Sequence, residues 1–221
     1  MKNFIPIILS FLILSCSKGY NPAVVSARKE ASDIGIEIMK KGGNAFDAMV
    51  AVHLALAVTY PIAGNIGGGG FVVYHTSNGE SGSLDFREKA PGKAFKNMYL
   101  DENGDVIEGM STLGGAAVGV PGSIAGIFEI HSKFGSLPIQ DLFQPSIDLA
   151  KNGFVVTEKQ ENALKDKLQD FINVNGKESL FSKNYKQGDT LKNLNLLLSL
   201  FLRFVEFLQQ SFLQFLLHKM L

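Results

Sequence analysis

Four consecutive glycines, Gly67–Gly70, constrain this 221-residue chain more than any other feature. Glycine loses more conformational freedom on folding than any other residue, so a run of four needs a close backbone approach or a positive φ. No Lys-Ser or Lys-Thr pair follows, which excludes a P-loop. A dinucleotide-binding fingerprint is also excluded, because it would follow a strand, whereas this run precedes a strand pattern. We interpret the run as close packing of a loop on the core.

The segment before the glycines predicts a buried helix over residues 45–60. It is rich in Ala, Val and Leu and carries no charged residue after Asp47. Asn44 is a preferred N-cap residue, and Pro61 ends the pattern. We interpret the histidine inside this helix, His53, as a packed, hydrogen-bonded core residue and not as a metal ligand.

The segment after the glycines predicts a β-hairpin. Phe71-Val-Val-Tyr74 has the β-branched and aromatic content of a strand. Asn78-Gly79 predicts a tight turn, and residues 82–88 read as the returning strand.

Helical periodicity and capping signals recur along the rest of the chain. They predict helices over residues 30–41, 123–134 with Ser123 as cap, 137–152 as two short helices divided at Pro145, and 157–171. Helices alternating with a hairpin predict an α/β (α+β) fold and argue against an all-helical one.

Composition excludes several classes of function. Lys plus Arg equals Asp plus Glu at 21 each, so the chain has no general attraction for nucleic acid. A single cysteine and four histidines offer no Cys/His metal framework, and no cofactor motif is recognisable. We therefore expect no metal site, no cofactor and no nucleic-acid partner.

Arg87 is the most informative charge. In Leu84-Asp85-Phe86-Arg87-Glu88, strand alternation puts Leu84 and Phe86 on one face and Asp85 and Arg87 on the other. A guanidinium presents a planar fork that suits bidentate binding of a carboxylate. That carboxylate is either internal, from Asp85 or Glu88, or it belongs to a ligand.

The amino-terminal end predicts export. Residues 1–15 place Lys2 before an apolar run and are interpreted as a signal peptide. The sequence Ile13-Leu-Ser-Cys16 resembles a bacterial lipobox, which predicts a lipidated Cys16 and a membrane-anchored lipoprotein facing the periplasm or the cell surface. Acyl chains add about 0.8 kcal/mol of membrane affinity per buried methylene. The alternative is an ordinary signal peptide with an incidental cysteine.

The carboxyl-terminal end, residues 193–221, differs sharply in composition from the rest. It is dominated by Leu and Phe and contains no Gly, Ala or Pro. Arg203 and Glu206 interrupt the apolar run, so it is too short for a transmembrane helix. The alternatives are a native docking helix and a reading-frame change near Asn193. We favour the second, in which this tail does not belong to the preceding fold.

Four motifs occur in an order and spacing that resemble the amino-terminal part of γ-glutamyltransferases, also called glutathione hydrolases. They are Lys41-Gly-Gly-Asn-Ala-Phe-Asp-Ala48, Gly67-Gly-Gly-Gly-Phe71, Asp85-Phe-Arg-Glu88 with Ala90-Pro91, and Gly119-Val-Pro-Gly122. The similarity runs from about Asn21 to Lys192, and it predicts a large-subunit-like domain over residues 16–192. It implies the large-subunit portion of a four-layer αββα N-terminal nucleophile hydrolase fold. In this family a precursor cuts itself before a threonine, which then attacks the γ-glutamyl carbonyl.

The resemblance implies that Arg87 binds the α-carboxylate of glutathione or another γ-glutamyl compound. It assigns no catalytic residue to this chain, because no Thr-Thr-His or Thr-Ser-His sequence occurs in it. We therefore expect the chain to need a missing small-subunit half and to be inactive alone. The alternative is a catalytically dead, lipid-anchored remnant or binding module.

Overall fold

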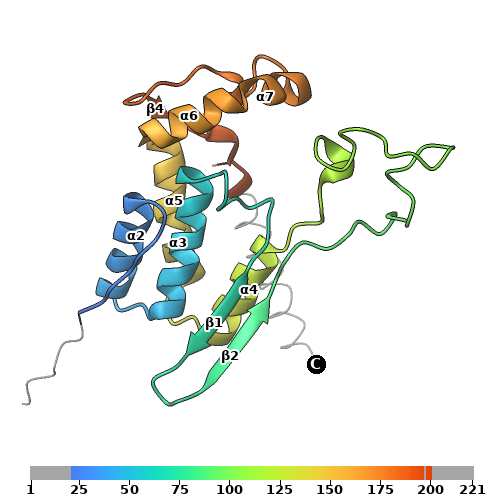
Figure 1. The fold of residues 1–221 in the computed structure, drawn as a ribbon. Coiled ribbons are helices and arrows are strands. Elements are labelled where there is room, and N and C mark those ends of the chain that lie inside the picture. Colours follow the sequence, from blue (N-terminus) through green and yellow to red (C-terminus); the bar gives the residue numbers. More distant parts are fainter. Residues whose placement is uncertain (1–20, 197, 201–221) are drawn as a thin grey trace, which may run out of the picture.

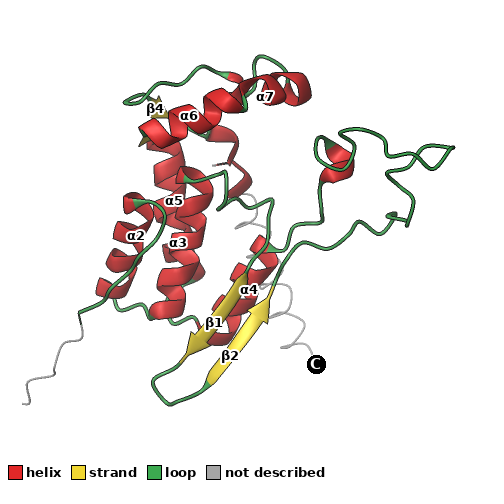
Figure 2. Ribbon diagram, in the orientation of Figure 1, coloured by secondary structure: helices red, strands yellow, loops and turns green. Residues whose placement is uncertain are grey.

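A computed structural model describes residues 21–196 and 198–200 and shows a mixture of helices and short antiparallel strands (Figures 1 and 2). In chain order the elements are α2 (Lys29–Lys40), α3 (Ala45–Thr59), β1 (Phe71–His75), β2 (Ser81–Asp85), the 3-10 turn η2 (Gly115–Ala117), α4 (Ser123–Phe134), α5 (Ile139–Asn152), β3 (Phe154–Val155), α6 (Glu158–Asp166), α7 (Leu168–Asn175), the 3-10 turn η3 (Leu180–Ser182) and β4 (Thr190–Leu191). The expected α+β class is confirmed.

Helix α3 lies at the centre of the helical layer and packs against α2, α4 and α5. After Ala45 every residue of this helix is buried or half-buried, because almost every position after Asp47 is apolar. Asn44 caps the helix: its side chain accepts hydrogen bonds from the backbone N–H groups of Phe46 and Asp47, and the Asp47 carboxylate accepts from the Asn44 N–H. The predicted helix and its cap are both confirmed.

Strands β1 and β2 form the predicted hairpin, with Phe71 opposite Asp85. Alternation directs Val72 and Leu84 toward the core, while Phe71 lies on the exposed face. The strand β2 is shorter than predicted, but the pairing continues for one hydrogen bond, because the Phe86 N–H donates to the Gly70 carbonyl at 3.0 Å.

Residues 88–120 form a long arm that leaves the hairpin and returns to α4 (Figure 1). A bridge between Lys89 and Val120 closes its base. The Tyr99 hydroxyl donates to the Ala116 carbonyl at 2.9 Å farther out. The arm exposes several large apolar side chains: Phe95, Val106, Ile107, Leu113, Val118 and Val120.

Two helical predictions were wrong. Residues 139–152 form one continuous helix with Pro145 inside it, not two short helices. Leu142, Phe143 and Ser146 around the proline are buried, so packing against α3 compensates for the hydrogen bond that proline cannot make. The segment predicted as one helix from Thr157 is divided into α6 and α7.

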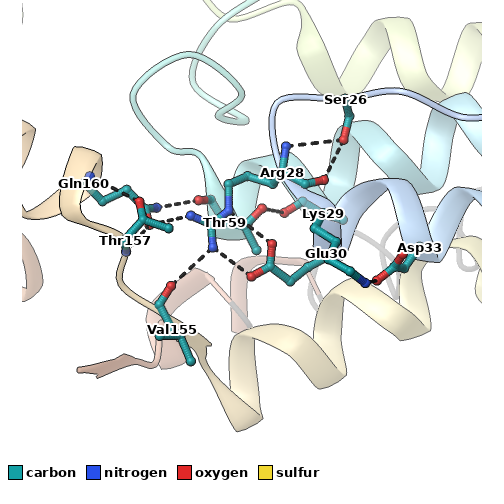
Figure 3. Close-up of polar contacts among 10 residues, drawn as sticks. Ser26, Arg28, Lys29, Glu30, Asp33, Thr59, Val155, Thr157 and Gln160 are labelled. Atoms are coloured by element: carbon teal, nitrogen blue, oxygen red, sulfur yellow. Dashed lines mark hydrogen bonds and ion pairs between the residues drawn. The ribbon is translucent and has the colours of Figure 1, made fainter. Parts of the chain in front are cut away.

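A buried arginine ties the start of α2 to α6 (Figure 3). Arg28, with a side chain 8% exposed, donates to both carboxylate oxygens of Glu30 and to the side-chain oxygen of Gln160 at 2.5 Å. It also donates to the Val155 carbonyl at 3.2 Å. The Gln160 amide in turn donates to the Thr59 carbonyl at the end of α3, at 2.7 Å. Residues distant in sequence are thereby joined in one network.

The start of the Leu/Phe-rich segment contacts the helical layer. The Asn193 N–H donates to the Ala150 carbonyl at 3.1 Å, and Leu200 is fully buried in the core. Residues 1–15, Cys16 and residues 201–221 lie outside the described residues, and the domain boundaries predicted at 15 and 192 stay predictions. Within the described part, no helix has the length and apolar content needed to cross a membrane.

Candidate functional site

A cleft of about 580 Å³ lies between residues 84–89 and the start of α4. Arg87 is on one wall, and Pro121, Gly122 and Ala125 are on the other. The cleft therefore lies where two of the sequence motifs meet, one carrying Arg87 and the other ending at Gly122.

The Arg87 side chain is 64% exposed and belongs to no buried ion pair. Its Nε lies 4.0 Å from Oδ1 of Asp85, whose side chain is 62% exposed. Such a solvated, long contact contributes little to stability. The guanidinium carbon also lies over the Phe71 ring, 5.2 Å from its centre, which is a cation–π geometry. The planar fork therefore stays available to a carboxylate in the cleft.

The Asp85 carboxylate lies closer to the backbone N–H of Arg87 than to its guanidinium. The Arg87 N–H donates to Asp85 Oδ1 at 3.0 Å. Of the two internal partners that sequence reasoning left open, Asp85 makes the ion pair that the structure describes for Arg87. The role of Arg87 in binding a substrate stays a prediction.

The glycine run packs directly beneath Arg87. A Cβ on Gly69 would lie 2.6 Å from both the Arg87 Cα and the Phe86 carbonyl oxygen, closer than atoms can approach. None of the four glycines has a positive φ. At Gly69 and Gly70, glycine is therefore required by close approach and not by backbone conformation, which agrees with the sequence interpretation of the run as close packing.

The Gly68 carbonyl links the two glycine-rich stretches. It accepts hydrogen bonds from the N–H groups of Gly122 and Ser123 at 2.9 and 3.0 Å. Gly122, and not Ser123, is the N-cap of α4, so the capping role predicted for Ser123 was wrong. Its hydroxyl instead donates to the Asn65 carbonyl at 3.3 Å, which anchors the start of the glycine loop.

His53 lies below this segment. Its ring centre is 6.2 Å from that of Phe86, and its buried Nε2 has no hydrogen-bond partner among the described residues. Burial in this apolar setting lowers the pKa of His53. His53 is half-buried, so the interpretation as a packed residue holds only in part, and the hydrogen bond expected for it is absent at Nε2 within the described part of the chain.

No group of three or more His, Cys, Asp or Glu side chains in the described ranges is arranged to hold a metal ion. Sequence reasoning missed the Phe71 ring that lies under the Arg87 guanidinium, and it missed Gly126, which lines the cleft. The hairpin register places Phe71 opposite Asp85, two residues before Arg87, and so could have revealed the first. The second depends on the docking of α4, which no local pattern encodes.

Comparison with known proteins identifies this arrangement. The family model described as gamma-glutamyltranspeptidase matches residues 31–202. A glutathione hydrolase proenzyme of Pseudomonas sp. (strain A14) is 50% identical over 151 residues, which are 68% of this chain and 26% of the relative. The glutathione hydrolase proenzyme of Escherichia coli (strain K12) is 41% identical over 181 residues, 80% of this chain and 31% of that protein.

A solved structure agrees with the sequence relatives. The crystal structure of Helicobacter pylori gamma-glutamyltranspeptidase is similar with a TM-score of 0.80 and 41% identity, covering 83% of this chain and 54% of that one. The described fold is thus a portion of the N-terminal nucleophile hydrolase architecture, and the chain spans about a third or less of the length of the two proenzymes. On the family match and on the order of its motifs, this chain belongs to the gamma-glutamyltranspeptidase family.

Proposed function

We propose that this chain supplies the carboxylate-binding part of a site that transfers γ-glutamyl groups. The observation that carries the proposal is the position of Arg87, whose guanidinium lies on the wall of the cleft and remains largely exposed. In this proposal Arg87 forms a two-point contact with the α-carboxylate of glutathione or a related γ-glutamyl compound.

Fixing the α-carboxylate would set the position of the γ-carbonyl. Orienting a substrate in this way can lower a reaction barrier considerably, because translational and rotational freedom is lost before the chemical step. A nucleophile on the other half of the site would attack that carbonyl, break the amide bond and form an acyl-enzyme, with the amine released as the protonated leaving group. The acyl-enzyme would then pass the γ-glutamyl group to water or to an amino acid or peptide, which regenerates the nucleophile. This chain contributes the binding part of that sequence of events.

Arg87→Lys tests the binding role, because lysine keeps the charge and loses the fork. We expect glutathione binding by the full chain, measured by titration calorimetry, to weaken at least about tenfold while the melting temperature stays unchanged. Lys177→Gln, a change at an exposed lysine outside the cleft, is the matched control. Equal affinity of Arg87→Lys and the unmodified chain would contradict the proposal.

Reconstitution tests the catalytic part. The chain is co-expressed with a small-subunit half from a family member, and release of the coloured aniline from a γ-glutamyl anilide is followed. Turnover that appears only on co-expression, and that Arg87→Lys reduces, supports a split transferase. Glutathione binding without turnover on co-expression favours a binding module.

We also propose that the chain is exported and anchored to a membrane through Cys16. The support is the signal-like segment followed by the lipobox-like sequence that ends at this single cysteine. Incorporation of a labelled fatty acid in a bacterial host, lost in Cys16→Ser, is the expected result. Label retained in Cys16→Ser, or absent from the unmodified chain, rejects lipidation at this position.

A further inference from the structure

The side chain of Phe86, next to Arg87, packs against the core and is bounded by glycines where it lines the cleft. A Cβ on Gly126 of α4 would lie 2.3 Å from Cγ of Phe86, and one on Gly70 would lie 2.9 Å from its Cε2. The third neighbour is the tilted ring of His53. The Phe86 ring therefore fills a slot whose walls lack side chains on two sides.

The backbone of Phe86 is confined as well. Its N–H donates to the Gly70 carbonyl at 3.0 Å, and a Cβ on Gly122 would lie 2.0 Å from its carbonyl oxygen. In contrast, the Arg87 side chain is exposed, and its guanidinium makes a long ion pair with Asp85 and the ring contact with Phe71. The direction of Arg87 is thus constrained through the preceding residue and through its own backbone, whose N–H donates to Asp85 and whose Cα lies against Gly69.

We propose that Phe86 is a positioning residue for Arg87: its ring, held in the slot formed by Gly70, Gly126 and His53, sets where the guanidinium meets a substrate carboxylate. Strand alternation supplies the mechanism, because anchoring one residue inward directs the next one outward into the cleft. The consequence for ligand binding rests on the proposed function, whereas the mechanical coupling between Phe86 and Arg87 does not.

Gly126→Ala is the sharpest test. Alanine has a higher helix propensity than glycine, so propensity alone predicts a more stable α4. The slot predicts the opposite, because the new methyl group would displace the Phe86 ring. Phe86→Leu in the Gly126→Ala background shortens the displaced side chain and is expected to restore the geometry. Gly92→Ala is the control, because a Cβ there meets nothing within 4 Å and its φ is not positive.

The measurement uses the full chain with only its arginines labelled by ¹⁵N. The sequence has three, Arg28, Arg87 and Arg203, so the Arg87 backbone signal is assigned by its loss in Arg87→Lys. In Gly126→Ala we expect this signal to shift and its hydrogen exchange to rise at least about tenfold, while the Arg28 signal is unchanged. The double variant is expected to reverse most of both changes.

An Arg87 signal that stays in place in Gly126→Ala overturns the proposal. If that variant fails to fold, Phe86→Leu alone decides, since loss of the aromatic ring should raise exchange at Arg87 but not at Arg28. Titration with reduced glutathione separates the two claims. A shift of the Arg87 signal that needs about tenfold more ligand in Gly126→Ala supports both. No shift in the unmodified chain rejects substrate binding by Arg87, while the ligand-free signals still decide the role of Phe86.

Discussion

The carbonyl oxygen of Phe86 occupies the space that a side chain on Gly122 would need, 2.0 Å from the position of its Cβ. Gly122 is also the N-cap of α4, and its N–H donates to the Gly68 carbonyl. The start of one helix, the end of one strand and the glycine loop therefore meet at a single backbone crossing. Because the obstructing atoms belong to the backbone, a small side-chain movement cannot relieve the contact.

Gly122→Ala is expected to destabilise the chain by about 1–3 kcal/mol, since overpacking forces the backbone to shift. Urea unfolding followed by circular dichroism measures the change. Gly115→Ala serves as control, because a Cβ there meets nothing within 4 Å. Equal loss of stability in the two variants would show that this crossing is not tightly packed.

Asp47 makes stability depend on pH in the acid range. Burial acts to raise the pKa of this carboxyl, but hydrogen bonds from the Ser136 hydroxyl and from the N–H groups of Asn44, Ser136 and Leu137 outweigh burial and lower the pKa. A depressed folded-state pKa contributes stability that is present above the unfolded value, about 3.9, and is lost as pH falls through the folded value.

Asp47→Asn should reduce this acid dependence and lower stability by about 1–3 kcal/mol near neutral pH, because an amide cannot accept all of these bonds. Urea unfolding between about pH 2.5 and 6 compares it with Asp166→Asn, a change at an exposed aspartate. An unchanged slope in Asp47→Asn would show that other carboxyl groups cause the acid dependence.

Arg28 should be far more important for stability than the lysine beside it. Arg28→Lys keeps the charge but cannot satisfy Glu30, Gln160 and Val155 together, so we expect a loss of about 2–4 kcal/mol. Lys29→Gln removes a pair with Asp33 in which the lysine is 84% exposed, and it should leave the melting temperature almost unchanged. Similar melting temperatures for both variants would exclude a structural role for the network in Figure 3.

His53 predicts a second pH effect, nearer neutrality. Because burial lowers its pKa, the unfolded chain binds the proton more readily than the folded chain does. The free energy of unfolding is then unaffected by His53 above about pH 6.5 and falls as pH drops below that value. It levels off once the folded histidine is protonated. His53→Leu should flatten this part of the profile and also remove an unpaired Nε2 from the interior. A profile that keeps its shape in His53→Leu would show that His53 does not cause this effect. His75→Leu, a change at an exposed position, is the control for replacing a histidine by leucine.

Local sequence patterns predicted the elements that depend on neighbouring residues. The Asn44 cap, the apolar run of α3 and the Asn78-Gly79 turn each express a preference of a few consecutive residues, and the structure contains all three. Alternation likewise separated Phe86 from Arg87, because successive side chains of a strand point to opposite faces. The family resemblance rested on motifs of this local kind.

Tertiary structure decided what depends on contacts between distant segments. Pro145 stays inside α5 because the helix packs against α3, and the Ser123 hydroxyl donates to the Asn65 carbonyl because the glycine loop lies against the start of α4. The sequence by itself determined that Arg87 is directed outward from the strand. Only the packing of α4 and the glycine loop around Phe86 placed it at a cleft, because close approach of backbones joins residues that no local pattern relates.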